Sequence, residues 1–326
     1  MNDSITDVPG IRVGHAQDLN AATGCTVVLC EQGAVPGVVV CGGAPGTRET
    51  DCLRPENIVS RIHAVFLSGG SAYGLQCAGG IMRYLEERGV GFDLGVAKVP
   101  IVAGAVLQDL ALGDATVRPD ESMGYEACRR ASEQTKAQGN VGAGTGANIG
   151  RMAGTVLGDT KGGLGTASRG VGGLIVGAMV AVNCNGDVVD PDTGAILAGT
   201  LRPDGSGFAD AMKMLGDETL PYQPLFPVNT TIGVVATNAR LDKAMATRVA
   251  IMAQDGYART IRPAHTLGDG DSVFCMATGE VNADPSQIGA IAAELLARAV
   301  VKAVKAAESL HGLPAYTDLV KKGIAK

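Results

Sequence analysis

PVNTTIGVVATNARL (residues 227–241) joins an irregular stretch of chain to a β-branched run. The run TTIGVVATN (230–238) is continuously apolar rather than alternating, which is typical of a strand covered on both faces. The stretch before it, residues 200–229, mixes proline, glycine and polar side chains and is longer than an ordinary connection. The sequence therefore predicts that Asn229 and Thr230 lie where a long loop enters a buried strand.

A threonine at such a position has a special chemistry available to it. Its hydroxyl can attack the carbonyl of the preceding residue and convert the peptide bond to an ester, which water then hydrolyses. Thr230 would thereby gain a free α-amine with an ordinary pKa of about 7.7–8, suited to act as the general base for its own hydroxyl. An Asn-Thr dipeptide alone is weak evidence, since a polar strand entry is its ordinary interpretation.

The rest of the chain reads as strands alternating with helices. β-branched runs predict further strands at 25–30, 37–43, 62–70, 99–104, 172–183 and 271–279. Helical spacing predicts helices at 72–88 after a Ser71 cap, 121–137, 243–256 after Asp242, and from Asp284 to about 308. No repeat or low-complexity linker divides the chain. We expect one α/β domain over residues 1–326.

Composition narrows the partners that we expect. The net charge is −6 and basic residues are scattered, so a nucleic-acid partner is not expected. The eight cysteines show no metal-ligand spacing, which favours reduced core thiols and a cytoplasmic location. The N-terminus lacks the features of a signal peptide, and the longest apolar segment, 170–184, is short for a membrane helix. We expect no cofactor and no metal.

Familiar catalytic motifs are incomplete in this chain. SGGSAYGL (68–75) has Tyr73 where a nucleophile elbow needs glycine, and GAGTGA (142–147) does not follow a predicted strand. Only four histidines exist, His15, His63, His265 and His311, and none lies in a recognisable triad motif. A lone histidine is more often structural than catalytic, and the threonine chemistry described above is one by which a hydrolase could manage without a catalytic histidine.

Several blocks together resemble one known family. Along the chain, these blocks are SGGSAYGL, VGAGTGANIGR, KGGLGTASRG, AVNCNG, NTTIGVVATNARL and PAHTLGDGDSVF. Their sequences and their order resemble those of the DmpA-type aminopeptidases. That family includes the L-aminopeptidase D-amidase/esterases, the β-peptidyl aminopeptidases and the nylon-oligomer hydrolases. The resemblance implies a four-layer α/β/β/α sandwich like that of N-terminal-nucleophile hydrolases. It also implies self-cleavage into fragments 1–229 and 230–326, which assemble into a homo-oligomer.

The resemblance also implies roles for single residues. Thr230 matches the nucleophile, and Asn229 matches the residue before the cut. Asn183 matches an asparagine beside the nucleophile, whose amide NH2 can donate to an oxyanion. Taken alone, Asn183 in AVNCNG reads as a turn residue at the end of a strand.

Three further positions match the nylon-oligomer branch. Asp269 and Asp271 match two acidic residues that can share a proton or orient the α-amine of Thr230. Taken alone, G-D-G-D reads equally well as a turn or a weak cation site. Tyr73 matches a tyrosine that can hydrogen-bond the amine or the substrate, although a buried tyrosine at a helix start is an equal alternative.

The nylon-oligomer branch of the family carries a lysine after its G-A-G motif. Arg151 stands at its position after the G-A-G motif, and an arginine cannot transfer protons because it stays charged. Lys161 in KGGLGTAS is the alternative.

The predicted activity is hydrolysis of amide bonds, in an aminopeptidase acting on short peptides, amino-acid amides or β-peptides. Two alternatives remain open at this point. One is an acyltransferase of the ornithine acetyltransferase kind, and the other is an uncleaved, non-catalytic binding or structural protein.

Overall fold

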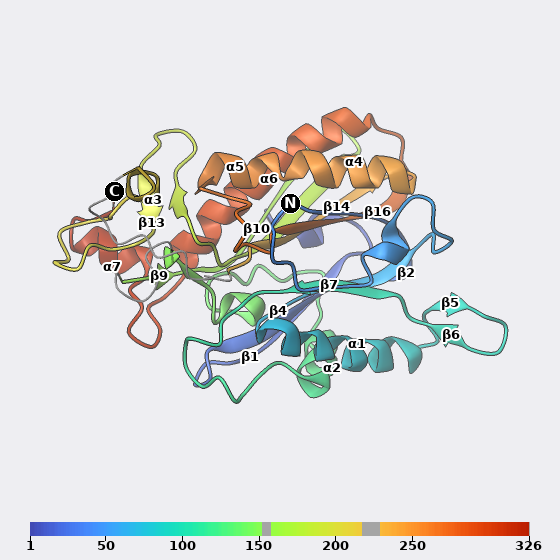
Figure 1. The fold of residues 1–326 in the computed structure, drawn as a ribbon. Helices are drawn as coiled ribbons and strands as arrows, with labels where there is room; N and C mark the ends of the chain where they lie inside the picture. Colours follow the sequence, from blue (N-terminus) through green and yellow to red (C-terminus); the bar gives the residue numbers. More distant parts are fainter. Residues whose placement is uncertain (152–157, 217–228, 326) are drawn as a thin grey trace.

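The structure, a computed structural model, describes residues 1–151, 158–216 and 229–325 and arranges them in four layers (Figure 1). Two β-sheets lie face to face, with helices on their outer faces. The first sheet contains β1 (Arg12–Asp18), the first half of β2 (Thr23–Val40), β4 (Ile62–Ser68), β7 (Val102–Val106) and β3 (Thr47–Arg48). The second contains β10 (Gly163–Val171), β11 (Leu174–Val182), β14 (Ile232–Ala239), β16 (Ser272–Val281) and the second half of β2.

Strand β2 connects the two sheets. Its first half pairs with β1 and β4, and its second half pairs with β16. The register shifts between Leu29 and Ala34, around Gly33, whose φ of 80° favours glycine. The two strands expected at 25–30 and 37–43 are therefore one bent strand, because Gly33 bends the chain without ending its pairing.

The second sheet has the order β10-β11-β14-β16-β2. β14 pairs antiparallel with β11 and parallel with β16, and β16 pairs antiparallel with β2. These directions bring the end of β11, the starts of β14 and β16, and the end of β2 to the same edge of the sheet. Residues that are far apart in the sequence meet at this edge.

Helices cover both outer faces. α1 (Cys77–Glu86) and α2 (Glu121–Arg129) lie on the first sheet, whereas α4 (Lys243–Ala253), α5 (Asp255–Thr260) and α6 (Pro285–Ala306) lie on the second (Figure 1). Asp242 and Asp284 cap α4 and α6 as predicted. Ser71 is not a cap, because the chain first forms the 3-10 helix η3 (Ser71–Gln76), which begins after Gly70. The helix expected at 121–137 ends at Arg129.

Three clusters of buried apolar side chains fill the three spaces between the layers. The cluster between the sheets includes Val28, Leu67, Met179, Ile232 and Phe274. The cluster under α1 and α2 includes Val27, Phe66, Ile81, Leu85 and Cys128, and the one under α4 and α6 includes Val180, Val235, Val249 and Leu296. Three cores between four layers confirm the predicted α/β/β/α sandwich.

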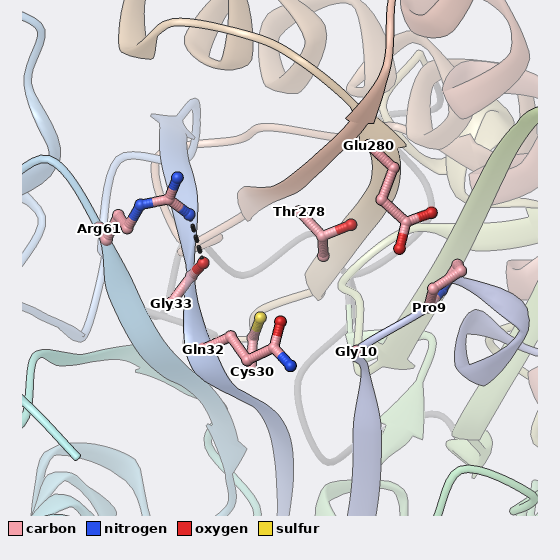
Figure 2. A pocket seen from close by; sticks show the side chains of 8 residues that line it. All are labelled: Pro9, Gly10, Cys30, Gln32, Gly33, Arg61, Thr278 and Glu280. Carbon is pink, nitrogen blue, oxygen red and sulfur yellow. Dashed lines mark hydrogen bonds between the residues drawn. The ribbon is translucent and has the colours of Figure 1, made fainter.

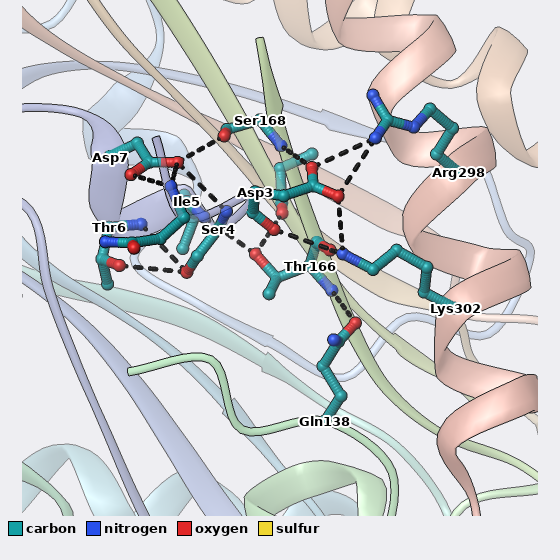
Figure 3. A network of polar contacts seen from close by, with 12 residues as sticks. Asp3, Ser4, Ile5, Thr6, Asp7, Gln138, Thr166, Ser168, Arg298 and Lys302 are labelled. Carbon is teal, nitrogen blue, oxygen red and sulfur yellow. Dashed lines mark hydrogen bonds and ion pairs between the residues drawn. The ribbon is translucent and has the colours of Figure 1, made fainter. Parts of the chain in front are cut away.

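The N-terminal segment is tied to the second sheet and to α6 (Figure 3). The Asp3 carboxylate accepts hydrogen bonds from the Ser168 N–H on β10 and from Arg298 and Lys302 on α6. Partial burial raises the pKa of Asp3, but these donors outweigh it and hold the pKa below its usual value. Residues near position 3 thus bind a helix almost 300 positions later.

In the described parts of the chain, no helix is both long enough and apolar enough to cross a membrane.

Candidate active site

Thr230 lies just before β14, at the edge where the four strand ends meet. It is buried, and its backbone N–H donates to the Asn183 carbonyl at 2.6 Å. A cavity of ≈130 Å³ opens beside it. Among the described residues, the cavity is lined by Ala44, Pro45, Gly46, Ser71, Ala72, Val106, Leu107, Gln108 and Thr230. The hydroxyl-bearing residue predicted as the nucleophile is therefore next to a small space without charged side chains in its described lining.

The peptide group before Thr230 is held by the loop that precedes β16. The Asn229 N–H donates to the Gly268 carbonyl at 3.1 Å, and the Asn229 carbonyl accepts from the Gly270 N–H at 3.0 Å. The Asn229 side chain donates to Asn148 Oδ1 at 3.4 Å. The segment predicted to precede Asn229 as a long loop lies partly outside the described residues, at 217–228.

Asn183 follows β11 and is fully buried. Its Oδ1 accepts from the Asn148 N–H at 2.9 Å, and its Nδ2 donates to the Gln108 carbonyl at 3.2 Å. These two contacts fix which end of the amide carries the donors, and the backbone carbonyl holds the Thr230 N–H. Asn148 and Gln108 were not predicted from the sequence, because they bind the Asn183 side chain through backbone groups that any residue would supply.

Asp271 is buried immediately before β16. Its Oδ1 accepts from the Thr231 N–H at 2.8 Å, and its Oδ2 accepts from both the N–H and the Nδ1 of His265, at 3.0 and 2.8 Å. His265 and Thr231, the residue after Thr230, therefore bind the same carboxylate. His265 was expected to be structural, and the one signal for it was its place in PAHTLGDGDSVF, three residues before Gly268.

Asp269 lies two residues earlier and is equally buried. Its carboxylate accepts from Thr266, through both the N–H and the hydroxyl, and from Asn185 Nδ2 at 3.0 Å. Burial, together with the negative charge of Asp271, raises the pKa of Asp269 to about 6. The structure thus places both aspartates beside the Asn229–Thr230 bond and commits their oxygens to holding the surrounding loop.

Lys161 is fully buried behind the site. Its Nζ donates to the carbonyls of Gly144, Ala147 and Gly162 at 2.8–2.9 Å, and burial lowers its pKa to about 7. The Ala147 carbonyl precedes Asn148, whose N–H bonds the Asn183 amide. Lys161 therefore supports the segment that orients Asn183.

Arg151 is paired differently. It forms an ion pair with Asp159 at 2.8 Å and contacts the Gln108 side chain at 3.5 Å. Because Gln108 lines the cavity, Arg151 reaches the site through that residue, not directly.

Tyr73 is not brought to Thr230. Its side chain is half exposed, and the Arg118 guanidinium lies over its ring, 3.8 Å from the centroid. Its neighbours Ser71 and Ala72 line the cavity, whereas Tyr73 is absent from the described lining. The hydrogen bond from Tyr73 to the amine or the substrate stays a prediction, whereas the alternative of a buried tyrosine at a helix start is wrong, because half of the side chain is exposed.

A second cavity, of ≈380 Å³, lies at the far end of β16 (Figure 2). Its lining includes Cys30, Arg61, Thr278 and Glu280, and Arg61 donates to the Gly33 carbonyl at 2.7 Å. None of the predicted site residues belongs to its described lining.

Comparisons with known proteins agree on one family. The profile of peptidase family S58 matches residues 3–317. An uncharacterized aminopeptidase of Mycobacterium leprae is 46% identical over 97% of this chain and 94% of its own length. A 6-aminohexanoate-oligomer endohydrolase of Kocuria sp. is 30% identical over 92% of this chain and 85% of its own length.

Solved structures share the fold. The L-aminopeptidase D-Ala-esterase/amidase of Ochrobactrum anthropi, a variant of the Ntn-hydrolase fold, superposes with a TM-score of 0.72 over 100% of this chain and 95% of its own, at 21% identity. A Burkholderia sp. β-aminopeptidase gives 0.70 over 99% and 94%, at 24% identity. With the family profile and the two sequence relatives, the chain is shown to be an amide hydrolase that belongs to peptidase family S58.

Proposed function

We propose that this chain cuts itself between Asn229 and Thr230 and then acts as an aminopeptidase with Thr230 as its nucleophile. The observation that carries the proposal is the position of Thr230, buried between Asn183 and the Gly270 loop and open to a small cavity. The fragments are 1–229 and 230–326, and together they form one catalytic body.

The arrangement suits the chemistry of turnover. Cleavage frees the α-amine of Thr230, and its nitrogen already donates to the Asn183 carbonyl at 2.6 Å. The amine takes the proton of the hydroxyl, the hydroxyl oxygen attacks the substrate carbonyl, and the proton passes to the leaving amine. Water then hydrolyses the ester to release the acid.

Asn183 is our candidate for the turnover oxyanion donor. One of its two amide hydrogens goes to the Gln108 carbonyl, and we assign the other to the substrate oxygen. Lys161 is the better counterpart of the family lysine than Arg151, because it supports Asn148 and with it the Asn183 amide. Asp269 and Asp271 hold the loop beside the nucleophile.

The cavity favours short acyl groups. Its described lining is small and largely apolar, with Gln108, Ser71 and Thr230 as the polar members. Relatives are named as aminopeptidases and as hydrolases of 6-aminohexanoate oligomers. Short peptides, amino-acid amides and β-peptides are therefore the substrates to test first.

The test is the mass of the purified protein. Two chains of 229 and 97 residues, the smaller beginning Thr-Thr-Ile-Gly, are expected. A fully active protein of one intact chain would exclude the proposal, since the α-amine would still be part of a peptide bond. The acyltransferase and the non-catalytic alternatives gain no support from the comparisons. A labelled amine acceptor that collected most of the acyl group would favour transfer.

We propose a cytoplasmic homo-oligomer of processed protomers. All eight cysteines are free thiols, as expected in a reducing compartment. Large apolar side chains protrude at Ile58, Val96 and Leu267, which are 85–94% exposed in the single chain. Size-exclusion chromatography with light scattering tests the oligomer, and a monomer would contradict it.

A further inference from the structure

We propose that the backbone N–H of Gly270 is the oxyanion donor of self-cleavage, separate from the side-chain donor that serves turnover. This inference rests on the proposed self-cleavage. The juxtaposition that carries it is the contact of the Gly270 N–H with the Asn229 carbonyl oxygen at 3.0 Å. That oxygen belongs to the carbonyl that the Thr230 hydroxyl must attack.

The step can be followed atom by atom. The Thr230 Oγ bonds to the carbonyl carbon of Asn229, and the carbonyl oxygen takes up the negative charge. The C–N bond then breaks, and the hydroxyl proton ends on the Thr230 nitrogen, which leaves an ester between residues 229 and 230. Water hydrolyses this ester to the Asn229 carboxylate and the Thr230 hydroxyl. A donor already aligned on the oxygen stabilises the charge as it forms.

The Asn183 side chain does not occupy this place in the uncut chain. Its Oδ1 accepts from the Asn148 N–H and its Nδ2 donates to the Gln108 carbonyl, whereas its backbone carbonyl holds the nitrogen of the bond to be cut. The two ends of this peptide bond therefore have different partners. Gly270 binds its carbonyl oxygen, and Asn183 binds its nitrogen.

The atoms around Gly270 explain why this position is a glycine. A Cβ at Gly270 would lie 2.7 Å from the Thr230 hydroxyl oxygen and 2.7 Å from the Ala44 carbonyl oxygen. Any side chain would collide with the nucleophile. The flanking aspartates then act as positioning residues: Asp269 binds Thr266 and Asn185, and Asp271 binds Thr231 and His265. Together they hold the Gly270 N–H against the scissile carbonyl.

The test replaces the peptide bond between Asp269 and Gly270 by an ester, by incorporating glycolic acid at position 270. This change removes the N–H and adds no side chain, unlike Gly270→Ala. The control is the same replacement at Gly43, whose N–H donates to the Thr266 carbonyl at 3.1 Å and so also binds this loop, but not the scissile carbonyl. Self-cleavage is followed on denaturing gels, and turnover is expressed per mole of 97-residue fragment.

We expect the ester at 270 to slow self-cleavage by about 10²–10³-fold, with the kcat of the matured fraction within about 3-fold of the parent. The ester at 43 should leave the self-cleavage rate within about 3-fold. Parent-like self-cleavage with the ester at 270, or an equal loss with both esters, would overturn the assignment and leave the proposed function intact. An unmodified chain that never cuts at Asn229 would instead overturn the proposed function.

Discussion

Replacing Lys161 by methionine is expected to change how the stability of the protein depends on pH between 7 and 9. Methionine has a similar length but carries no proton. In the folded protein, burial lowers the pKa of Lys161 to about 7, from an ordinary value of 10.5. A charged ammonium group can donate one hydrogen to each of the carbonyls of Gly144, Ala147 and Gly162. Burial of the positive charge costs free energy and therefore favours the neutral amine.

The sign follows from proton uptake. Between pH 7 and 10.5 the folded chain has lost a proton that the unfolded chain retains, so the free energy of unfolding rises with pH, by at most about 1.4 kcal/mol per pH unit. The contribution of deprotonated Lys161 to the free energy of unfolding is complete above the pKa that this residue has in the unfolded chain. It is lost as the pH falls through the pKa that the residue has in the folded chain. Between pH 7 and 9 the rise amounts to about 2 kcal/mol.

The assay is urea unfolding at pH 7, 8 and 9, with Thr230→Ala present throughout so that the chain stays in one piece. The difference in unfolding free energy between this parent and its Lys161→Met derivative should grow by about 2 kcal/mol across the range. Lys136→Met, at an exposed position, should keep the pH dependence of the parent. If the Lys161 variant also kept it, the buried ammonium would hold its proton throughout, and the reasoning from burial would be refuted.

Four further predictions concern the site. Thr230→Ala should abolish both self-cleavage and turnover, whereas Thr230→Ser should retain both on gels and in activity assays; cleavage at the same bond in the alanine variant would point to a contaminating protease. Asn183→Ala should lower kcat by about 10²–10³-fold with little change in KM, and a loss seen only in KM would make it a binding residue. His265→Ala should slow self-cleavage by about 10-fold or more, because the Asp271 carboxylate would lose a hydrogen-bond donor. His265→Asn should restore most of the rate, since its Nδ2 can donate to that carboxylate in place of the Nδ1. Equal rates for the two variants would show that His265 does not position Asp271. Asp269→Asn should move the acidic limb of kcat/KM to lower pH, because losing a nearby negative charge lowers the pKa of the Thr230 amine, and an unchanged midpoint would show that Asp269 does not tune it.

The sequence was sufficient for four of the strands and for two helix starts. β-branched runs located β4, β11, β14 and β16, and a single capping aspartate located each of α4 and α6. It was not sufficient for β2, because local hydrophobicity does not say whether Gly33 ends a strand or bends it. That outcome depends on partners on both sides, β4 and β16, which lie far away in the sequence.

Several of the residues that the family blocks indicated are ones that the structure brings together. Thr230, Asn183, Asp269 and Asp271 are brought to one sheet edge, and the family blocks contain all four. Support residues were harder to recognise. The partners of Lys161 are three backbone carbonyls, and a carbonyl leaves no mark in a sequence. The block that contains Tyr73 is conspicuous in the sequence, but it does not say where the side chain lies, and the structure leaves that side chain half exposed beneath the Arg118 guanidinium.

If the chain cuts itself as proposed, the position of β14 and β16 between β11 and β2 would affect the lifetime of the processed protein. Both central strands would belong to the proposed 97-residue fragment, and strands of the proposed 229-residue fragment would flank them on either side. A cut chain that unfolds becomes two molecules, and each must find the other before the sheet can re-form. Refolding then depends on concentration, whereas the first folding did not. If the proposed self-cleavage occurs, a processed protein that unfolds would not readily refold, so its persistence would be set by how slowly it unfolds.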